Sequence, residues 1–153
     1  MRIGRDGTWY YLGSPIQRPA MVRLFARVLR READGSYALV TPVERLTIRV
    51  DDVPFVAVEL ARRGEGRDAI IAFRTNLDEV VAAGPDHPLM LRPAPGTSEP
   101  APYIGVRAGL DALLARPGYY ELAEIAQAGP PGPGGELGIW SGGGFFALDA
   151  AHE

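Results

Sequence analysis

The sequence predicts an α+β protein made of two half-domains around a duplicated antiparallel β-meander. Three observations favour this class: a strand pattern that recurs at a constant offset, an amphipathic helical segment before it, and two short helical patterns after it. The 153 residues suffice for one ordinary domain or for two smaller parts that share a core. We assign residues 1–64 to an N-terminal α+β part and residues 65–153 to a C-terminal α+β part.

The internal repeat is the strongest organisational signal. Residues 37–56 align with residues 71–90 at an offset of 34. The aligned pairs include Thr41 with Thr75, Glu44 with Asp78, Asp52 with Asp86, Pro54 with Pro88, Leu39 with Phe73, Leu46 with Val80, and Phe55 with Leu89. Each copy predicts strand, turn, strand, turn and strand. Two copies are too few for a solenoid, so we expect one twisted sheet or two abutting sheets, with Asp52-Val53-Pro54 and Asp86-His87-Pro88 as equivalent turns.

An N-terminal hairpin and helix precede the repeat. Residues 2–4 and 9–12 flank the turn Asp6-Gly7, and aromatic residues favour strands. A helix is expected from Pro19, because the fixed φ of proline suits the first helical position. Its expected apolar face consists of Met21, Leu24, Phe25 and Val28, with Arg30 and Arg31 in the last turn and Asp34-Gly35 as the stop.

The C-terminal third predicts two short helices and a closing hairpin. The proline-rich residues 93–102 form a loop, and residues 103–106 read as a strand. Leu110, Leu113 and Leu114 predict a short helix that Pro117 ends, and Tyr119, Leu122 and Ile125 predict a second one. Residues 137–148 predict a hairpin around three consecutive glycines.

Composition excludes several functions. All 16 cations are arginine, so a P-loop lysine and Schiff-base chemistry are excluded, and the absence of cysteine excludes thiolate nucleophiles and thiolate metal sites. A net charge of −3 argues against a protein built to grip nucleic-acid phosphates. No apolar run approaches the roughly 20 residues of a membrane helix, and no signal-peptide pattern opens the chain. We expect a cytoplasmic protein without a metal or cofactor.

Candidate ligand-binding residues are few. Arg23 belongs to a basic stripe on the first helix, and Arg18 and Arg107 could add bidentate donors for an anion; the alternative is a solvated basic face. His87 and Asp86 lie in a proline-flanked turn, where they either bind a ligand or simply form an Asx-turn. Trp140 belongs to a set of terminal aromatics that pack in the core or mark a contact surface.

Several segments together resemble a known bacterial family, the domain-of-unknown-function family numbered 1285. These segments are D-G-T-W-Y-Y-L-G-S-P-I (6–16), L-V-T-P-V-E-R-L (39–46), D-V-P-F-V-A-V (52–58), T-N-L-D-E-V-V-A-A-G-P-D-H-P-L (75–89), P-Y-I-G-V-R (102–107) and W-S-G-G-G-F-F (140–146). The resemblance implies a two-part α+β fold with repeated motifs, a second part superficially like a pleckstrin-homology domain, and a role in signalling or ligand sensing with a site between the parts. It implies no catalytic residues. It also implies a segment before the position of Met1, so we expect a truncated start.

Our leading hypothesis is therefore a non-enzymatic binding or sensing module, linked to signal transduction, that takes a small anionic ligand or a protein partner. The candidate contacts are Arg18, Arg23, Asp86, His87, Arg107 and Trp140. The alternatives are a small hydrolase-like enzyme that uses His87 and Asp86, and a protein-interaction module that exposes aromatics near Trp9 or Trp140.

Overall fold

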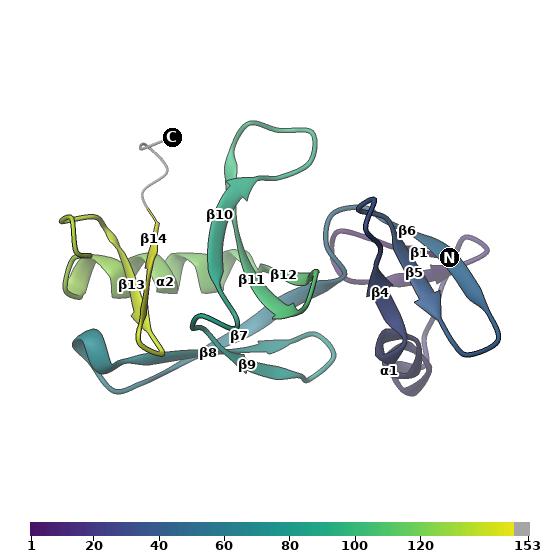
Figure 1. Cartoon of the computed structure of the whole chain (residues 1–153), viewed down its shortest axis with the longest axis horizontal. Coiled ribbons are helices and arrows are strands. Elements are labelled where there is room, and N and C mark those ends of the chain that lie inside the picture. The colour runs from purple at the N-terminus through teal and green to yellow at the C-terminus, as the bar shows by residue number, and fades with distance from the viewer. Residues whose placement is uncertain (149–153) are drawn as a thin grey trace.

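Two six-stranded curled sheets, two α-helices and a separate hairpin make up the computed structural model, which describes residues 1–148 (Figure 1). The first part carries β1 (Arg2–Ile3), β2 (Trp9–Tyr11), β3 (Ser14–Pro15), α1 (Pro19–Arg27), β4 (Leu29–Arg31), β5 (Tyr37–Val40) and β6 (Arg45–Val50). The second part carries β7 (Phe55–Arg63), a 3₁₀ turn (Gly66–Asp68), β8 (Ile70–Thr75), β9 (Val80–Ala82), β10 (Leu89–Pro93), β11 (Pro100–Arg107), β12 (Leu110–Leu114), α2 (Arg116–Ala128), β13 (Gly138–Ser141) and β14 (Gly144–Ala147). The two-part α+β architecture with similar halves is thus confirmed.

The first sheet has the strand order β3-β2-β1-β6-β5-β4. β1 and β6 run parallel, with Ile3 beside Val50, and the other pairs are antiparallel. Because side chains alternate across a strand, Ile3, Trp9 and Ile48 lie on one buried face. α1 contributes to the same core through Val22 and Ala26, and the ring of Phe25 stacks on the Trp9 indole with centroids 6.2 Å apart.

The second sheet has the order β10-β11-β12-β7-β8-β9, in which β7 and β12 are parallel. α2 and the β13–β14 hairpin pack beside this sheet (Figure 1). Its apolar side chains and those of the first sheet belong to one continuous buried cluster, which includes Ile3, Trp9, Phe55, Ile71 and Leu122. The two parts therefore share a core.

The repeat is present as two hairpins, but the expected meanders are wrong in their third strands. β5–β6 and β8–β9 are antiparallel hairpins. β7 and β10, which follow Pro54 and Pro88, do not pair with the preceding strands; instead β7 pairs with β8 and β12, and β10 pairs with β11. Proline has no N–H for a ladder, so the chain breaks away at both positions. The change of sheet falls between Val50 and Phe55 rather than after residue 64, where the sequence analysis placed it.

The two copies also differ in register by one residue. Leu39 pairs with Leu46, but Phe73, the counterpart of Leu39, pairs with Val81 rather than with Val80. The turn between β8 and β9 is one residue longer than the turn between β5 and β6. It accommodates the additional residue at Asp78, whose φ of 68° lies in the left-handed region. As a result Val81 is buried, whereas Val80 is 64% exposed.

The first helix is shorter than expected, and its buried face is different. α1 ends at Arg27, and Leu29–Arg31 forms β4 on the edge of β5, so Arg30 and Arg31 lie in a strand. Pairing with β5 and full burial of Leu29 outweigh the helix propensity of this segment. Val22 and Ala26 face the core, whereas Met21 and Leu24 of the expected apolar face are exposed.

Of the two short C-terminal helices predicted, the first is wrong, and the second lies within α2. Leu110–Leu114 is the strand β12, in which Leu110, Ala112 and Leu114 alternate into the core. Pro117 does not end a helix; it lies in the first turn of the single helix α2, where a missing N–H costs nothing. A short apolar run fits a buried strand as well as a helix, and the partners of β12 decide between them.

The Ser141 hydroxyl joins the β13–β14 hairpin to the second sheet. It accepts a hydrogen bond from the Ile71 backbone N–H and donates one to the Ala83 carbonyl, both at 2.8 Å, and its residue is fully buried. We predict that Ser141→Ala lowers the free energy of unfolding by about 2–4 kcal/mol, because two buried backbone groups lose their partner. Urea denaturation measures this. Ser14→Ala, at an exposed position, is the control, and equal losses for both variants would contradict the assignment.

Candidate functional site

The two parts meet where α1 faces the turn between β8 and β9. Arg23 of α1 donates to the Asp78 carboxylate at 2.6 Å and, through Nε, to the Leu77 carbonyl at 3.4 Å. Next to this contact the Asn76 side chain accepts a hydrogen bond from the Val56 N–H at 3.0 Å and reaches the Gly7 carbonyl at 3.5 Å. Residues 76–78 therefore connect the second part to both α1 and the β1–β2 turn.

Asp78 is shared between two arginines. Its second oxygen accepts from Arg74 at 2.9 Å, and Arg74 also pairs with Glu59 at 3.0 Å. Because these side chains are largely exposed, each pair adds little to stability. Their contribution here is orientation, since Asp78 holds the Arg23 guanidinium at the junction.

Arg107 of β11 approaches the same junction from the second sheet. It donates to the Ala26 carbonyl of α1 at 3.2 Å, and its guanidinium lies 5.5 Å from the centroid of the Phe55 ring. Its buried Nε has no hydrogen-bond partner within residues 1–148 and lies 3.9 Å from the Glu79 carboxylate. Arg107 is thus a half-buried cation whose donors are incompletely satisfied.

These groups surround a hollow of about 310 Å³, which we call the arginine hollow. It is lined by Arg23, Ala26, Arg27, Leu77, Glu79 and Arg107. Three of the six are cations and one is a carboxylate, and Arg27 makes no ion pair within the described part of the chain. Guanidinium groups bind carboxylate and phosphate oxygens in pairs, so the geometry suits a small anion.

The structure brings together only two of the six predicted site residues. Arg23 and Arg107 line the arginine hollow, whereas Arg18, at the start of α1, is exposed and does not line it. Arg27 and Glu79 were missing from the predicted set. The arginine stripe of the first helix could have indicated Arg27, but only the fold brings Glu79 to the same hollow.

His87 and Asp86 lie elsewhere, in a tight turn closed by reciprocal backbone hydrogen bonds between Gly84 and His87. The His87 Nδ1 is 2.9 Å from the Gly105 carbonyl, which can only accept, so this nitrogen carries the proton. Asp86 is exposed. The two turns of the repeat differ, because the Asp52 side chain is only 5% exposed and accepts hydrogen bonds from Tyr103.

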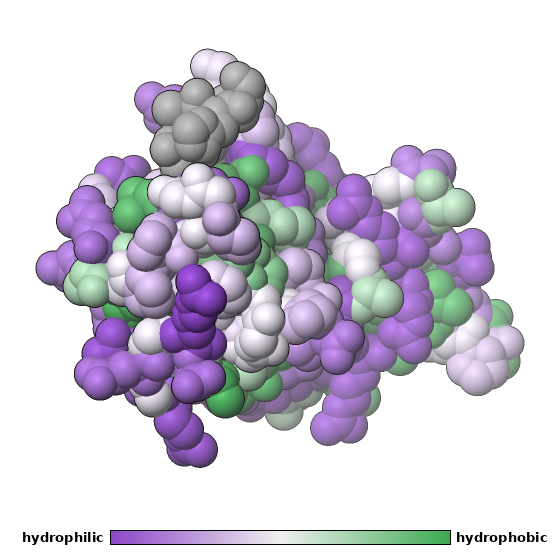
Figure 2. Space-filling model, turned by 60° about the vertical axis from the view of Figure 1, so that its left-hand side comes forward, coloured by the Kyte–Doolittle hydropathy of each residue, from purple (hydrophilic) through white to green (hydrophobic). Residues whose placement is uncertain are grey.

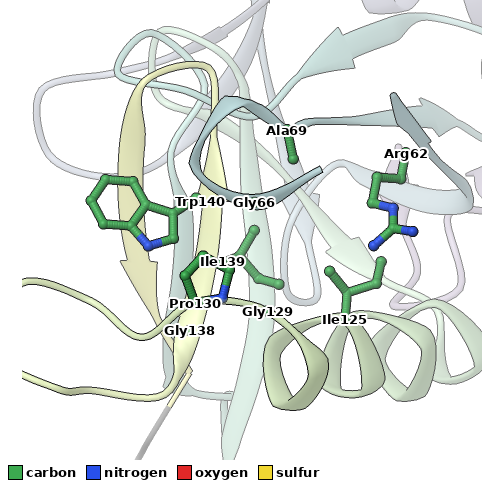
Figure 3. A pocket seen from close by; sticks show the side chains of 9 residues that line it. All are labelled: Arg62, Gly66, Ala69, Ile125, Gly129, Pro130, Gly138, Ile139 and Trp140. Atoms are coloured by element: carbon green, nitrogen blue, oxygen red, sulfur yellow. The ribbon is translucent and has the colours of Figure 1, made fainter. Parts of the chain in front are cut away.

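Trp140 is also remote from the arginine hollow. Its indole N–H donates to the Pro131 carbonyl at 3.0 Å, and the Arg67 guanidinium lies 5.0 Å from its ring centroid. The adjacent pocket, between β13, α2 and the 3₁₀ turn, holds only about 30 Å³, room for about one water. Figure 3 shows the indole projecting from β13 away from Arg62 and Ile125. Trp140 therefore acts as a packing residue of its hairpin.

A larger groove of about 600 Å³ lies between the β1–β2 turn, the β10–β11 loop and the start of α2. Arg5 and Asp6 line it from the first part, and Arg116, Tyr119 and Tyr120 line it from α2. Its remaining lining is mainly Ala, Pro and Leu from β11 and β12. None of these residues belongs to the predicted set of ligand contacts, because they come from four separate segments of the chain.

Asp52 lies in the segment that connects the parts and anchors it to β11. The Tyr103 hydroxyl donates to its carboxylate at 2.9 Å, and Arg92 lies 3.9 Å from the Tyr103 ring centroid. Burial, followed by the hydrogen bond to Asp52, raises the pKa of Tyr103 to about 12. The connecting segment is therefore fixed by a buried tyrosine that stays protonated well above pH 10.

Comparison with known proteins identifies the family. The N-terminal "Domain of unknown function (DUF1285)" matches residues 1–53, and the C-terminal domain of "Protein of unknown function (DUF1285)" matches residues 54–148. The chain belongs to the DUF1285 family. No curated protein matches the chain. In the described residues no group of three or more His, Asp or Glu side chains could hold a metal ion, and no helix is long and apolar enough to cross a membrane.

Two crystal structures of DUF1285 proteins are similar to the chain. The protein from Silicibacter pomeroyi DSS-3 is 49% identical, with 97% of this chain and 78% of that chain covered and a TM-score of 0.88. The protein from Shewanella baltica OS155 is 24% identical, with 81% of this chain and 90% of that chain covered and a TM-score of 0.61, and so shares the fold alone. The two family matches confirm the resemblance to the DUF1285 family that the sequence indicated, and the description of the family names no function.

The pKa of Tyr103 leads to a pH prediction. The folded value of about 12 exceeds the ordinary value of 10.0, so the stabilisation is complete below pH 10 and is lost as pH rises toward 12. We predict that wild type is more stable than Tyr103→Phe below pH 10 and that the difference shrinks by roughly 2–3 kcal/mol by pH 12. Urea denaturation at several pH values measures it. A difference independent of pH would contradict the raised pKa of Tyr103.

Proposed function

We propose that this chain is a non-enzymatic ligand-binding or sensing module, linked to signal transduction, that takes a small anionic ligand in the arginine hollow. The observation that carries the proposal is the convergence of Arg23 and Arg27 from α1 with Arg107 from β11 on one hollow. Arg107 brings a buried Nε without a hydrogen-bond partner in the described residues. A bound carboxylate or phosphate would supply the missing acceptors.

The position of the arginine hollow supports a sensing role. Its arginines come from both parts, so an anion that bridges them would strengthen the contact between α1 and the second sheet. A ligand with higher affinity for one arrangement of the two parts shifts the population toward it. The ion pairs that now join the parts at Arg23 and Arg107 are largely exposed or loose, so they can be replaced at low cost.

The hydrolase alternative has less support. The Nδ1 of His87 is engaged by the Gly105 carbonyl, and Asp86 lies exposed in the same turn. An acid–base pair needs its carboxylate oriented toward the imidazole, and here a backbone carbonyl occupies that position. The likeness of the second part to a pleckstrin-homology domain and the cytoplasmic location stay predictions.

The proposal predicts which arginines matter. We expect some anions in a thermal-shift screen of nucleotides and anionic metabolites to raise the melting temperature. We expect Arg27→Ala, at an exposed position, and Arg107→Ala to weaken binding of the best anion by about tenfold or more in isothermal titration calorimetry, because each removes a charge-assisted contact.

Arg116→Ala in the larger groove is the matched control, since it also removes one arginine. It is expected to bind as wild type. If Arg116→Ala abolishes binding and Arg27→Ala does not, the ligand occupies the larger groove and the proposed site is wrong. If no anion raises the melting temperature, the proposed function is wrong.

A further inference from the structure

Two hairpin tips project from the same end of the first sheet. β1 and β6 run parallel, and β2 and β5 run antiparallel to them, so the β2–β3 turn and the β5–β6 turn lie at one end. The β1–β2 turn lies at the other end, where Gly7 meets Asn76 of the second part. Figure 1 shows both tips at the end of the molecule farthest from β13 and β14. Within residues 1–148, this end of the first part therefore faces away from the second part, and we call it the free end.

The free end exposes large apolar side chains. Leu12, at the β2–β3 tip, is 85% exposed, and Val43, at the β5–β6 tip, is 93% exposed, the two highest values among large apolar residues of the described chain. Behind them Tyr11 and Leu46 are 55% and 46% exposed. We call these four residues the hairpin-tip patch. In Figure 2 the first part lies at the right, where hydrophobic side chains are visible among hydrophilic ones.

The internal repeat shows that the exposure of Val43 is unusual for its position. At the offset of 34 residues Val43 corresponds to Leu77, in the equivalent turn between β8 and β9. Leu77 is half-buried at the junction, where it packs against the core. One copy of the turn thus has a covered apolar residue, and the other copy presents its apolar residue to solvent.

Leu12 occupies a backbone conformation that leucine disfavours. Its φ is 51° and that of Gly13 is 84°, so both central residues of this two-residue turn are left-handed. Asn or Gly normally fills the first position, because a Cβ crowds the backbone there. No packing compensates Leu12, which is almost fully exposed. A strained, exposed leucine at a loop tip indicates a contact made outside the chain.

Charge is distributed unevenly between the parts. Residues 1–53 carry nine arginines against six carboxylates, a net charge of +3, whereas residues 54–153 carry seven against thirteen, a net charge of −6. Close to Val43, the Arg45 side chain is 64% exposed and pairs with Glu32 at 2.9 Å, and Glu44 is the carboxylate between Val43 and Arg45. Farther along β6, the Arg49 side chain is 80% exposed and lies 3.4 Å from the Asp51 carboxylate. The first part would therefore turn toward a negatively charged surface.

From these observations we propose that the free end of the first part docks onto an anionic lipid surface, with Leu12 and Val43 inserted at the level of the headgroups. Separate protruding tips suit a lipid surface, which deforms around each side chain. They do not suit a second copy of the chain, because a stable dimer buries about 800 Å² on each partner and needs a continuous face. The net charge of +3 on residues 1–53 would attract anionic headgroups.

Vesicle co-sedimentation tests the proposal. Wild type is expected to bind vesicles of phosphatidylcholine with about 30% phosphatidylglycerol, and to bind pure phosphatidylcholine more weakly. Leu12→Asn and Val43→Ser are each expected to weaken binding by about tenfold, because each removes an inserted aliphatic side chain. Leu12→Asn should also raise the melting temperature by about 2–4 °C, because Asn tolerates the left-handed conformation. Loss of binding in a more stable variant cannot come from unfolding.

Val58→Ser is the matched control, since Val58 is 45% exposed on the second part, and it should bind vesicles as wild type does. Failure of wild type to bind anionic vesicles would overturn the proposal, as would unchanged binding in both tip variants. Analytical ultracentrifugation adds a further test. If wild type is a dimer that Leu12→Asn dissociates, a second copy covers the hairpin-tip patch and the proposal is wrong.

Discussion

The docking of the turn at residues 75–79 against the first part is the contact on which the rest of the arrangement depends. Asn76 satisfies the Val56 N–H at the start of β7, and Asp78 holds Arg23 of α1. These contacts bring α1 close to β11, so Arg107 can reach the Ala26 carbonyl. Without these contacts there would be no arginine hollow, because its lining residues come from both parts of the chain, on either side of the junction.

The repeat gains functional meaning from this contact. Its two copies supply equivalent turns at opposite positions: residues 75–79 lie at the junction between the parts, whereas residues 41–44 lie at the free end. The additional residue in the second turn places Asp78 in a left-handed conformation, where its carboxylate meets Arg23 and Arg74. The duplicated turn thus lies at the junction between the parts in the second copy and forms an exposed hairpin tip in the first copy.

The candidate site was only partly predictable. Arg23 and Arg107 were chosen because arginine binds anions, and they do share a hollow; Arg18, Asp86, His87 and Trp140 were chosen on similar grounds and lie elsewhere. Residue type indicates what a side chain can bind, but not which side chains meet. Glu79 and Arg27 line the same hollow only because α1 packs beside the β8–β9 turn.

The sequence by itself determined the family, through segments that match it along the chain. It also determined most strands, the start of α1 at Pro19 and the hairpins of the repeat, because alternation, turn residues and proline act locally. Tertiary structure decided the rest. Leu29–Arg31 is a strand because it pairs with the edge of β5. Leu110–Leu114 is a strand because it pairs with β11 on one side and with β7 on the other. Partners for the third strand of each copy likewise came from later in the chain. Short apolar runs suit both helix and sheet, so the neighbours available after folding choose between them.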